Sequence, residues 1–426
     1  MINRTYGVAL FLCGFMAGVP ALAQDATYIR AGQLVDVVDG RVRSNQTIVI
    51  RGDRIERVGN SSAIDIPAGA NVIDLSNATV LPGLIDMHVH LTGDPEAQGY
   101  KNLAASVPRN ALFGAANGRR TLNAGFTTVR NVGAGGYADV ALRDAINNGD
   151  VAGPRMRVAA HALGITGGHC DNNLLPSEYG ASGGGIADGP WEIKKKIREN
   201  VKYGADLTKF CATGGVLSKG TTVGAQQYSL EEMIAIVTES HQRDRKVAAH
   251  AHGSEGIKAA IQAGVDSVEH ASLIDDEGIR MALEAGTFLV MDVYVDTYII
   301  EMGEAAGFLP ESIEKERIVG QAQRDNFRKA HAAGVRMAFG TDAGVYPHGN
   351  NGKQFAYMVQ YGMTPMEAIQ AATVNAAELL GWPADVGAIE SGMYADIIAV
   401  RGNPLEDIRE LEDVRFVMKG GEVYKQ

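Results

Sequence analysis

The pattern of hydrophobic and polar residues divides the chain into three parts. Residues 27–80 contain short segments in which apolar and polar residues alternate, separated by Asp-Gly and Gly-Asp pairs, a pattern typical of strands joined by hairpin turns. Residues 387–426 show the same pattern. Neither segment is long enough to form a hydrophobic core of its own. We therefore expect the two ends of the chain to combine into one small, discontinuous β-sandwich domain.

Between these β segments the pattern changes to a repeat of short apolar stretch, loop and helical stretch. A capping box with proline at the first helical position, Thr364-Pro-Met-Glu367, marks one helix start clearly. Eight α/β repeats in a row predict a (β/α)8 TIM barrel, with a doubly wound open sheet as the alternative. The predicted strands are Leu84–His90, Phe126–Val132, Arg157–Leu163, Leu207–Ala212, Lys246–His250, Ser267–His270, Phe288–Val293 and Met337–Thr341.

The first 23 residues have the features of a secretory leader. Arg4 supplies a positive charge, the apolar stretch from Tyr6 to Val19 is short for a membrane span, and Ala21-Leu-Ala23 is a small-residue cleavage site. An uncleaved membrane anchor is the alternative. We expect export to the periplasm or out of the cell. The predicted divisions are the signal peptide (1–23), the β-sandwich (24–81 and 386–426) and the barrel (82–385).

Charge and cysteine content narrow the range of partners. The full chain has a net charge of −11, and removal of the leader with its single Arg makes it −12. An acidic surface disfavours nucleic acid and anionic membranes, so we expect a small-molecule or dipeptide substrate as the partner. Two cysteines remain after the leader, Cys170 and Cys211. We expect two buried thiols, with a disulfide between them as the alternative, since both follow predicted strands.

Potential metal ligands stand at the ends of the predicted strands. His88 and His90 are one residue apart, so both side chains project from one face of the first strand and form a chelate. Because reactive groups of a barrel gather at the C-terminal strand ends, we expect a metal site there. The other candidates end the fourth, fifth and sixth strands and follow the eighth: Lys209, His250, His270 and Asp342.

Lys209 is the unusual member of this set, because a lysine that points into a barrel is unfavourable unless it is paired or modified. A salt bridge to a buried acid is one solution. The other is reaction with CO2 to give a carbamate that bridges two divalent ions. Two such ions, one carbamate and Asp342 leave the site positive, which would bring the pKa of a bridging water from ~15.7 to ~7 and generate hydroxide. Asp342 could then pass a proton to the leaving group; a helix N-cap is its alternative role.

Four motifs, together with Lys209, resemble the metal-dependent amidohydrolase superfamily: Pro82-Gly-Leu-Ile-Asp-Met-His-Val-His90, Ala249-His-Ala-His-Gly253, Ser267-Val-Glu-His270 and Gly340-Thr-Asp-Ala-Gly344. Three further segments resemble the branch that contains Xaa-Pro and other dipeptidases and ochratoxin-hydrolysing amidohydrolases. They are Gly164-Ile-Thr-Gly-Gly-His169, Lys209-Phe-Cys-Ala-Thr-Gly-Gly-Val-Leu-Ser218 and Gln227-Tyr-Ser229.

The resemblance implies a binuclear zinc site with an N6-carboxylated Lys209. It also implies that His169 and Tyr228 hold the scissile carbonyl oxygen or the substrate carboxylate, and that the enzyme is a homo-oligomer. Cys170 departs from the usual Gly-His-Gly-Asp of this loop, which puts its detail in doubt. We expect His252 to contact substrate or a metal ligand, with a solvated loop position as the alternative. The implied metal ligands are His88, His90, Lys209, His250, His270 and Asp342.

These expectations define a hydrolase that cleaves the amide bond of small N-acyl amino acids or dipeptides by attack of a metal-bridged hydroxide. Xaa-Pro-type dipeptides and ochratoxin A-like amides that release phenylalanine are the substrates that the resemblance implies. A lactonase, an esterase or a cyclic amidase such as an imidazolonepropionase is the alternative, because the metal site selects the electrophile and not the side chain. A non-catalytic zinc-binding protein is a third possibility. His161 and His348 receive no role at this stage.

Overall fold

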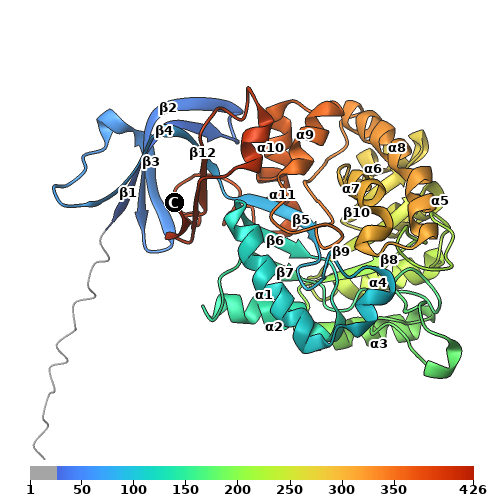
Figure 1. Cartoon of the computed structure of the whole chain (residues 1–426). Coiled ribbons are helices and arrows are strands. Elements are labelled where there is room, and N and C mark those ends of the chain that lie inside the picture. Colours follow the sequence, from blue (N-terminus) through green and yellow to red (C-terminus); the bar gives the residue numbers. More distant parts are fainter. Residues whose placement is uncertain (1–25) are drawn as a thin grey trace, which may run out of the picture.

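The computed structural model describes residues 26–426, which form a β domain beside a larger α/β domain (Figure 1). The predicted signal peptide, residues 1–23, lies outside the described residues. None of the helices described is both long and apolar enough to cross a bilayer.

The β domain joins the two ends of the described chain in one sheet with the strand order β14-β13-β12-β4-β1-β2-β3. The junction is between β4 and β12, which pair antiparallel with Pro82 opposite Ile397. The expected combination of both terminal segments is therefore present. The strands are β1 (Thr27–Asp36), β2 (Arg41–Arg51), β3 (Arg54–Asn60), β4 (Asn71–Pro82), β12 (Ile397–Val400), β13 (Phe416–Lys419) and β14 (Glu422–Lys425).

This sheet curls around a hydrophobic core of its own. Ile55 on the edge strand β3 and Phe416 on β13, near the other edge, belong to the same buried cluster. Ile55 also exchanges backbone hydrogen bonds with Met393 and Gly392, which precede β12. Strands near opposite edges can share one core only if the sheet folds back on itself, so a single sheet covers both sides of this core.

The α/β domain contains, within the described residues, one parallel sheet in the order β5-β6-β7 and another in the order β11-β10-β9-β8. Seven predicted strands are present, although the third begins and ends earlier than expected. The strands are β5 (Leu84–Val89), β6 (Phe126–Asn131), β7 (Arg155–Val158), β8 (Leu207–Cys211), β9 (Lys246–Gly253), β10 (Ser267–Leu273) and β11 (Phe288–Val290).

The predicted eighth strand, Met337–Thr341, does not form a continuous strand; this part of the chain makes only isolated β-bridges. Met337 bridges to Leu289 at the end of one sheet, and Ala343 bridges to Val89 at the end of the other. Leu163 and Phe210 make the corresponding bridge between the loop after β7 and strand β8. Backbone hydrogen bonds thus connect the two parallel sheets on both sides, although strand pairing is continuous only within each sheet.

Helices cover the outer side of the parallel sheets (Figure 1). The capping box at Thr364 is confirmed, because its side chain accepts a hydrogen bond from the Glu367 amide and Glu367 bonds back. The helices are α1 (Val107–Asn123), α2 (Ala138–Asn147), α3 (Gly189–Lys202), α4 (Leu230–His241), α5 (Ser254–Ala263), α6 (Asp276–Ala285), α7 (Val295–Met302), α8 (Pro310–Ala332), α9 (Lys353–Gln360), α10 (Pro365–Ala371) and α11 (Val374–Leu380). Short 3-10 turns η1 (Ser61–Ala63), η2 (Gly99–Ala104), η3 (Gly135–Tyr137), η4 (Ser177–Tyr179), η5 (Gly303–Ala306) and η6 (Ile408–Glu412) lie in connections.

Candidate active site

A cavity of about 350 Å³ opens where the parallel strands end, and every predicted metal ligand lines it. The site therefore forms from residues up to 254 positions apart in sequence, on or after β5, β8, β9 and β10 and on the segment after Phe339. The six residues that the sequence placed at strand ends and the structure brings together are His88, His90, Lys209, His250, His270 and Asp342.

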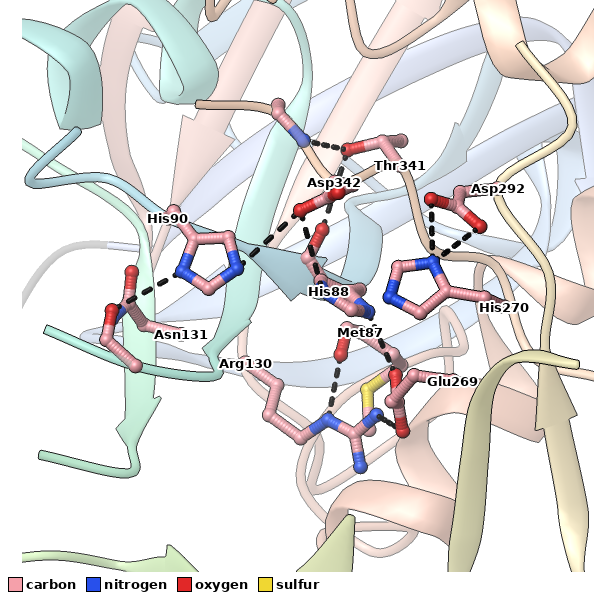
Figure 2. Close-up of polar contacts among 12 residues, drawn as sticks. Met87, His88, His90, Arg130, Asn131, Glu269, His270, Asp292, Thr341 and Asp342 are labelled. Carbon is pink, nitrogen blue, oxygen red and sulfur yellow. Dashed lines mark hydrogen bonds and ion pairs between the residues drawn. The ribbon is translucent and has the colours of Figure 1, made fainter. Parts of the chain in front are cut away.

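Asp342 lies between the two histidines of β5. Its Oδ1 is 3.4 Å from Nε2 of His88 and 3.4 Å from Nε2 of His90 (Figure 2). Asp342 has a φ of +54°, which is uncommon for a residue with a side chain and is often found at functional sites. Burial lowers the pKa of His90 to about 4, so this imidazole is neutral at pH 7, the form that binds a metal.

A second group of possible ligands lies beside the first. One nitrogen from each of His250, His252 and His270 lies within 4.8 Å of the others, and His270 also groups with Asp292 and Asp342. Burial and the neighbouring imidazoles lower the pKa of His250 well below its ordinary value. His252 is buried and its ring stacks on His270 at 4.8 Å, so it lies in the site and not in a solvated loop.

Two buried polar atoms of the cavity have no hydrogen-bond partner within the described part of the chain, Lys209 Nζ and His250 Nε2. An unpartnered buried donor or acceptor is costly, and coordination to a metal, directly or through a carbamate, would satisfy both. Burial also lowers the pKa of Lys209 to about 8, which raises the fraction of the neutral amine that can react with CO2. The donor set therefore fits divalent metal ions.

Charged groups that the sequence interpretation did not assign hold the histidines in place. Glu269 Oε2 lies 2.9 Å from His88 Nδ1, and Arg130 donates to Glu269 Oε1 at 2.7 Å (Figure 2). Asp292 lies 3.0 Å from His270 Nδ1. Carboxylates in this position fix the orientation of a metal-binding imidazole and raise its basicity. The sequence does hint at these roles, because Arg130 is a charged residue in an otherwise uncharged strand and Glu269 directly precedes His270.

His169 also lines the cavity, beside His250. Its ring stacks on His250 with centroids 4.1 Å apart, and its Nδ1 lies 2.9 Å from Ser218 Oγ. Burial and the nearby His270 and Lys209 lower the pKa of His169 to about 3. The imidazole is therefore neutral at pH 7.

The loop that carries His169 is covalently attached to strand β8. Cys170 and Cys211 form a disulfide with Cα atoms 6.1 Å apart, and both residues line the cavity. The expectation of two buried thiols is therefore wrong, because the loop after β7 brings the two side chains together. Through this bond His169 is fixed relative to Lys209, which stands two residues before Cys211.

Tyr228 does not lie in the site, which corrects the role expected for its hydroxyl. Its side chain is fully buried in the core, and the hydroxyl donates to the carbonyl of Ala187 at 3.0 Å. It does not line the cavity. His348 is also buried outside the cavity, where Nε2 lies 3.2 Å from the His90 carbonyl oxygen. His161 accepts a hydrogen bond from the Gly136 amide.

The chain belongs to the Amidohydrolase family, which matches residues 79–424. It is thus a hydrolytic enzyme that acts on amide bonds, and the family typically uses divalent metal ions. It is 35% identical over 423 residues to ochratoxinase of Aspergillus niger, covering 94% of this chain and 86% of that protein. A solved Xaa-Pro dipeptidase with methionine bound in its active site matches with a TM-score of 0.89 and 41% identity, covering 94% of this chain and all of that one. The structure of A. niger ochratoxinase matches with a TM-score of 0.83 and 33% identity, covering 94% of this chain and 96% of that one.

Proposed function

We propose that this protein is a binuclear metal hydrolase that cleaves the amide bond of dipeptides or small N-acyl amino acids. Xaa-Pro-type dipeptides and ochratoxin A-like amides that release phenylalanine are the substrate classes suggested by the relatives. The observation that carries the proposal is the meeting of six metal-ligand candidates with two unpartnered buried nitrogens in one cavity. Its volume, about 350 Å³, suits a ligand of this size.

We interpret the two parallel sheets and the bridges between them as a (β/α)8 barrel, and the curled terminal sheet as its β-sandwich domain. The ligands would then stand at the C-terminal face, where barrel enzymes have their active sites. Export directed by residues 1–23 and assembly into homo-oligomers remain part of the proposal.

Two divalent ions, zinc by preference, would be held by His88 and His90 on one side and by His250 and His270 on the other, with a carboxylated Lys209 and Asp342 between them. Bound ions would supply Lewis-acid activation of water and of the amide carbonyl. Carboxylates orient two of these ligands: Glu269 holds His88, and Asp292 holds His270.

The remaining side chains of the cavity would bind substrate and move a proton. Burial alone would raise the pKa of Asp342, but the imidazoles around it lower that pKa below its ordinary value, so the group is an ionised carboxylate at pH 7. In this form it would accept a proton and transfer it to the leaving nitrogen. The neutral His169 would hold the carbonyl oxygen or the substrate carboxylate. His252 lies in the same wall and would contact the substrate or a ligand.

The test is product analysis with zinc-replete protein on matched panels of dipeptides, N-acyl amino acids and ochratoxin A, beside lactones and esters. Release of free amino acids at higher kcat/KM than any lactone or ester is expected. Faster lactone turnover would overturn the assignment to amides.

The metal centre is tested separately with Lys209→Ala, which should lose bound zinc and activity and regain part of both with short carboxylic acids. Lys258→Ala on the surface of α5 is the matched control, expected to keep both. Full zinc content in Lys209→Ala would contradict a bridging carbamate.

A further inference from the structure

Glu316 lies in the wall of the candidate active-site cavity but has no part in the chemistry described above. It is on α8, is 4% exposed, and lines the cavity together with Val319 and Gln323 of the same helix. Within the described residues no side chain or backbone amide forms a hydrogen bond or an ion pair with its carboxyl group. Neither of its oxygens is among the fully buried unpartnered polar atoms of the described chain, so the carboxyl group is accessible from the cavity and free to bind a ligand there.

The surroundings of Glu316 are acidic. Asp296 and Asp292 both lie close enough to act on its charge, and the nearby cation, Arg324, already donates to Asp296 at 2.7 Å. The neighbouring Lys315 donates instead to the carbonyl of Ser218 at 2.6 Å. Neither cation donates a hydrogen bond to Glu316, and the acids around it outweigh the opposing effect of Arg324 on its pKa.

The carboxyl groups of Glu316 and Asp296 both lie close to Gly320 of α8. A Cβ at Gly320 would lie 2.8 Å from Asp296 Oδ2 and 3.3 Å from Glu316 Oε1. Any larger residue would displace these oxygens. The backbone of α8 at Gly320 thus lies close to both carboxyl groups.

Glu316 also stands apart from the candidate metal ligands. It belongs to none of the three groups of possible ligands in the described chain. Gln323, which donates to Asp292 at 2.8 Å, is seven residues further along α8, about 10 Å along the helix axis. Glu316 is thus displaced along α8 from the residue that contacts Asp292, the partner of His270.

We propose that Glu316 is a specificity-determining residue that binds a positively charged group of the substrate. The group is the α-ammonium of an unblocked dipeptide or the cationic side chain of a basic residue; both offer the same charge and hydrogen-bond donors. This inference rests on the proposed amide hydrolysis and narrows its substrates to amides that carry a cation. A bound cation would give Glu316 the partner that the protein does not supply.

Proton release provides a signature that a purely structural residue would not give. Burial, together with Asp296 and Asp292, raises the pKa of Glu316 to about 8, whereas Arg324 opposes the shift. Asp342 acts in the same direction as the other two acids. At pH 7 the carboxyl is thus mostly protonated. A bound cation favours the carboxylate, so binding should transfer a proton from Glu316 to the solvent.

The experiment compares zinc-loaded wild type, Glu316→Gln and the matched control Glu314→Gln, an exposed acid of the same helix that pairs with Arg317. Two substrate pairs distinguish the sources of the cation. A dipeptide is compared with its N-acetyl derivative, and an acylated lysine amide with the norleucine amide. kcat/KM and zinc content are measured for each.

In Glu316→Gln, kcat/KM should fall at least about tenfold, a loss of roughly 1.4 kcal/mol, for the cationic member of one pair only, with zinc content unchanged. The affected pair identifies the group that Glu316 binds. An equal change for both members of both pairs, no change in either, or a loss of zinc would overturn the proposal. The control should match wild type.

Calorimetric binding of the same compounds in two buffers of different ionisation enthalpy separates this proposal from the proposed function. If wild type hydrolyses none of them, amide hydrolysis as proposed fails. The role of Glu316 is then decided by binding alone: weaker binding and lost proton release for the cationic compound in Glu316→Gln support it, and equal binding in both proteins overturns it.

Discussion

The buried ion pair of Arg130 and Glu269 fixes the orientation of the His88 imidazole. The Arg130→Met variant tests this role. The guanidinium donates to the carbonyl of Met87 at 2.6 Å, to Ser267 Oγ at 2.9 Å and to Glu269 at 2.7 Å. Methionine keeps an unbranched apolar side chain but removes the charge and all three hydrogen bonds. Glu269 is then a fully buried carboxylate without its cation. Removing one partner of a buried ion pair costs about 3–5 kcal/mol of unfolding free energy.

The pH dependence of this loss has a defined sign. Burial alone would raise the pKa of Glu269, but Arg130 and the His88 hydrogen bond lower it below its ordinary value. An acid with a lowered pKa in the folded state stabilises the protein above its unfolded pKa, 4.5 for Glu, and loses this contribution as pH falls further. In Arg130→Met the carboxyl pKa rises. The difference in stability from wild type should therefore be largest near pH 7 and shrink below pH 4.5.

Chemical unfolding at pH 7 and at a pH well below 4.5 measures the stability, and chelator competition measures zinc affinity. Affinity should fall about 10–100-fold in Arg130→Met, because Glu269 no longer orients His88 correctly. The double variant Arg130→Met/Glu269→Gln should be less destabilised than Arg130→Met, since no buried charge remains. Arg280→Met, at an exposed pair with Glu284, is the control and should cost less than about 1 kcal/mol. A loss below about 1 kcal/mol in Arg130→Met would refute this reasoning.

Three further predictions concern single features. Glu316→Gln should stabilise metal-free protein by about 3 kcal/mol at pH 7 and about 1 kcal/mol at pH 5, measured by urea unfolding. The reason is that the pKa of Glu316 is raised from 4.5 to about 8 in the folded protein, so wild type loses stability as pH rises. Equal gains at both pH values would contradict this. The Cys170→Ser/Cys211→Ser variant removes a disulfide that spans 41 residues and should lose up to about 4 kcal/mol of unfolding free energy. Wild type in reductant should show the same loss, and thermal unfolding is the assay. Tyr228→Phe should lose about 0.5–1.5 kcal/mol through the Ala187 hydrogen bond but keep kcat/KM, and a fall in turnover with unchanged stability would restore a substrate role.

The order of elements and the candidate ligands could be predicted because the chemistry requires particular residue types at strand ends. His88, His90 and Asp342 stand in motifs whose spacing sets the direction of their side chains. The predicted eighth strand was less accurate. Its residues approach the neighbouring strands only through isolated bridges, and the left-handed backbone at Asp342 ends the extended conformation.

Features that depend on distance in space were not readable from the sequence. The orienting role of Glu269 comes from neighbouring strands that bring it to His88, and the disulfide comes from a loop path that no local pattern predicts. Tyr228 was misplaced for a related reason. It directly precedes Ser229, the N-cap of α4, and its ring packs into the core beneath that helix instead of the cavity.

The sheet of the β domain has a consequence for the order of folding. Its central contact joins Pro82 to Ile397, so β4 has a free edge throughout synthesis until nearly the last residues of the chain emerge. Exposed strand edges pair with other chains and promote aggregation. A carboxy-terminal truncation before β12 would make this exposure permanent. Delivery of a complete, unfolded chain across a membrane before folding would instead make both halves of the sheet available together.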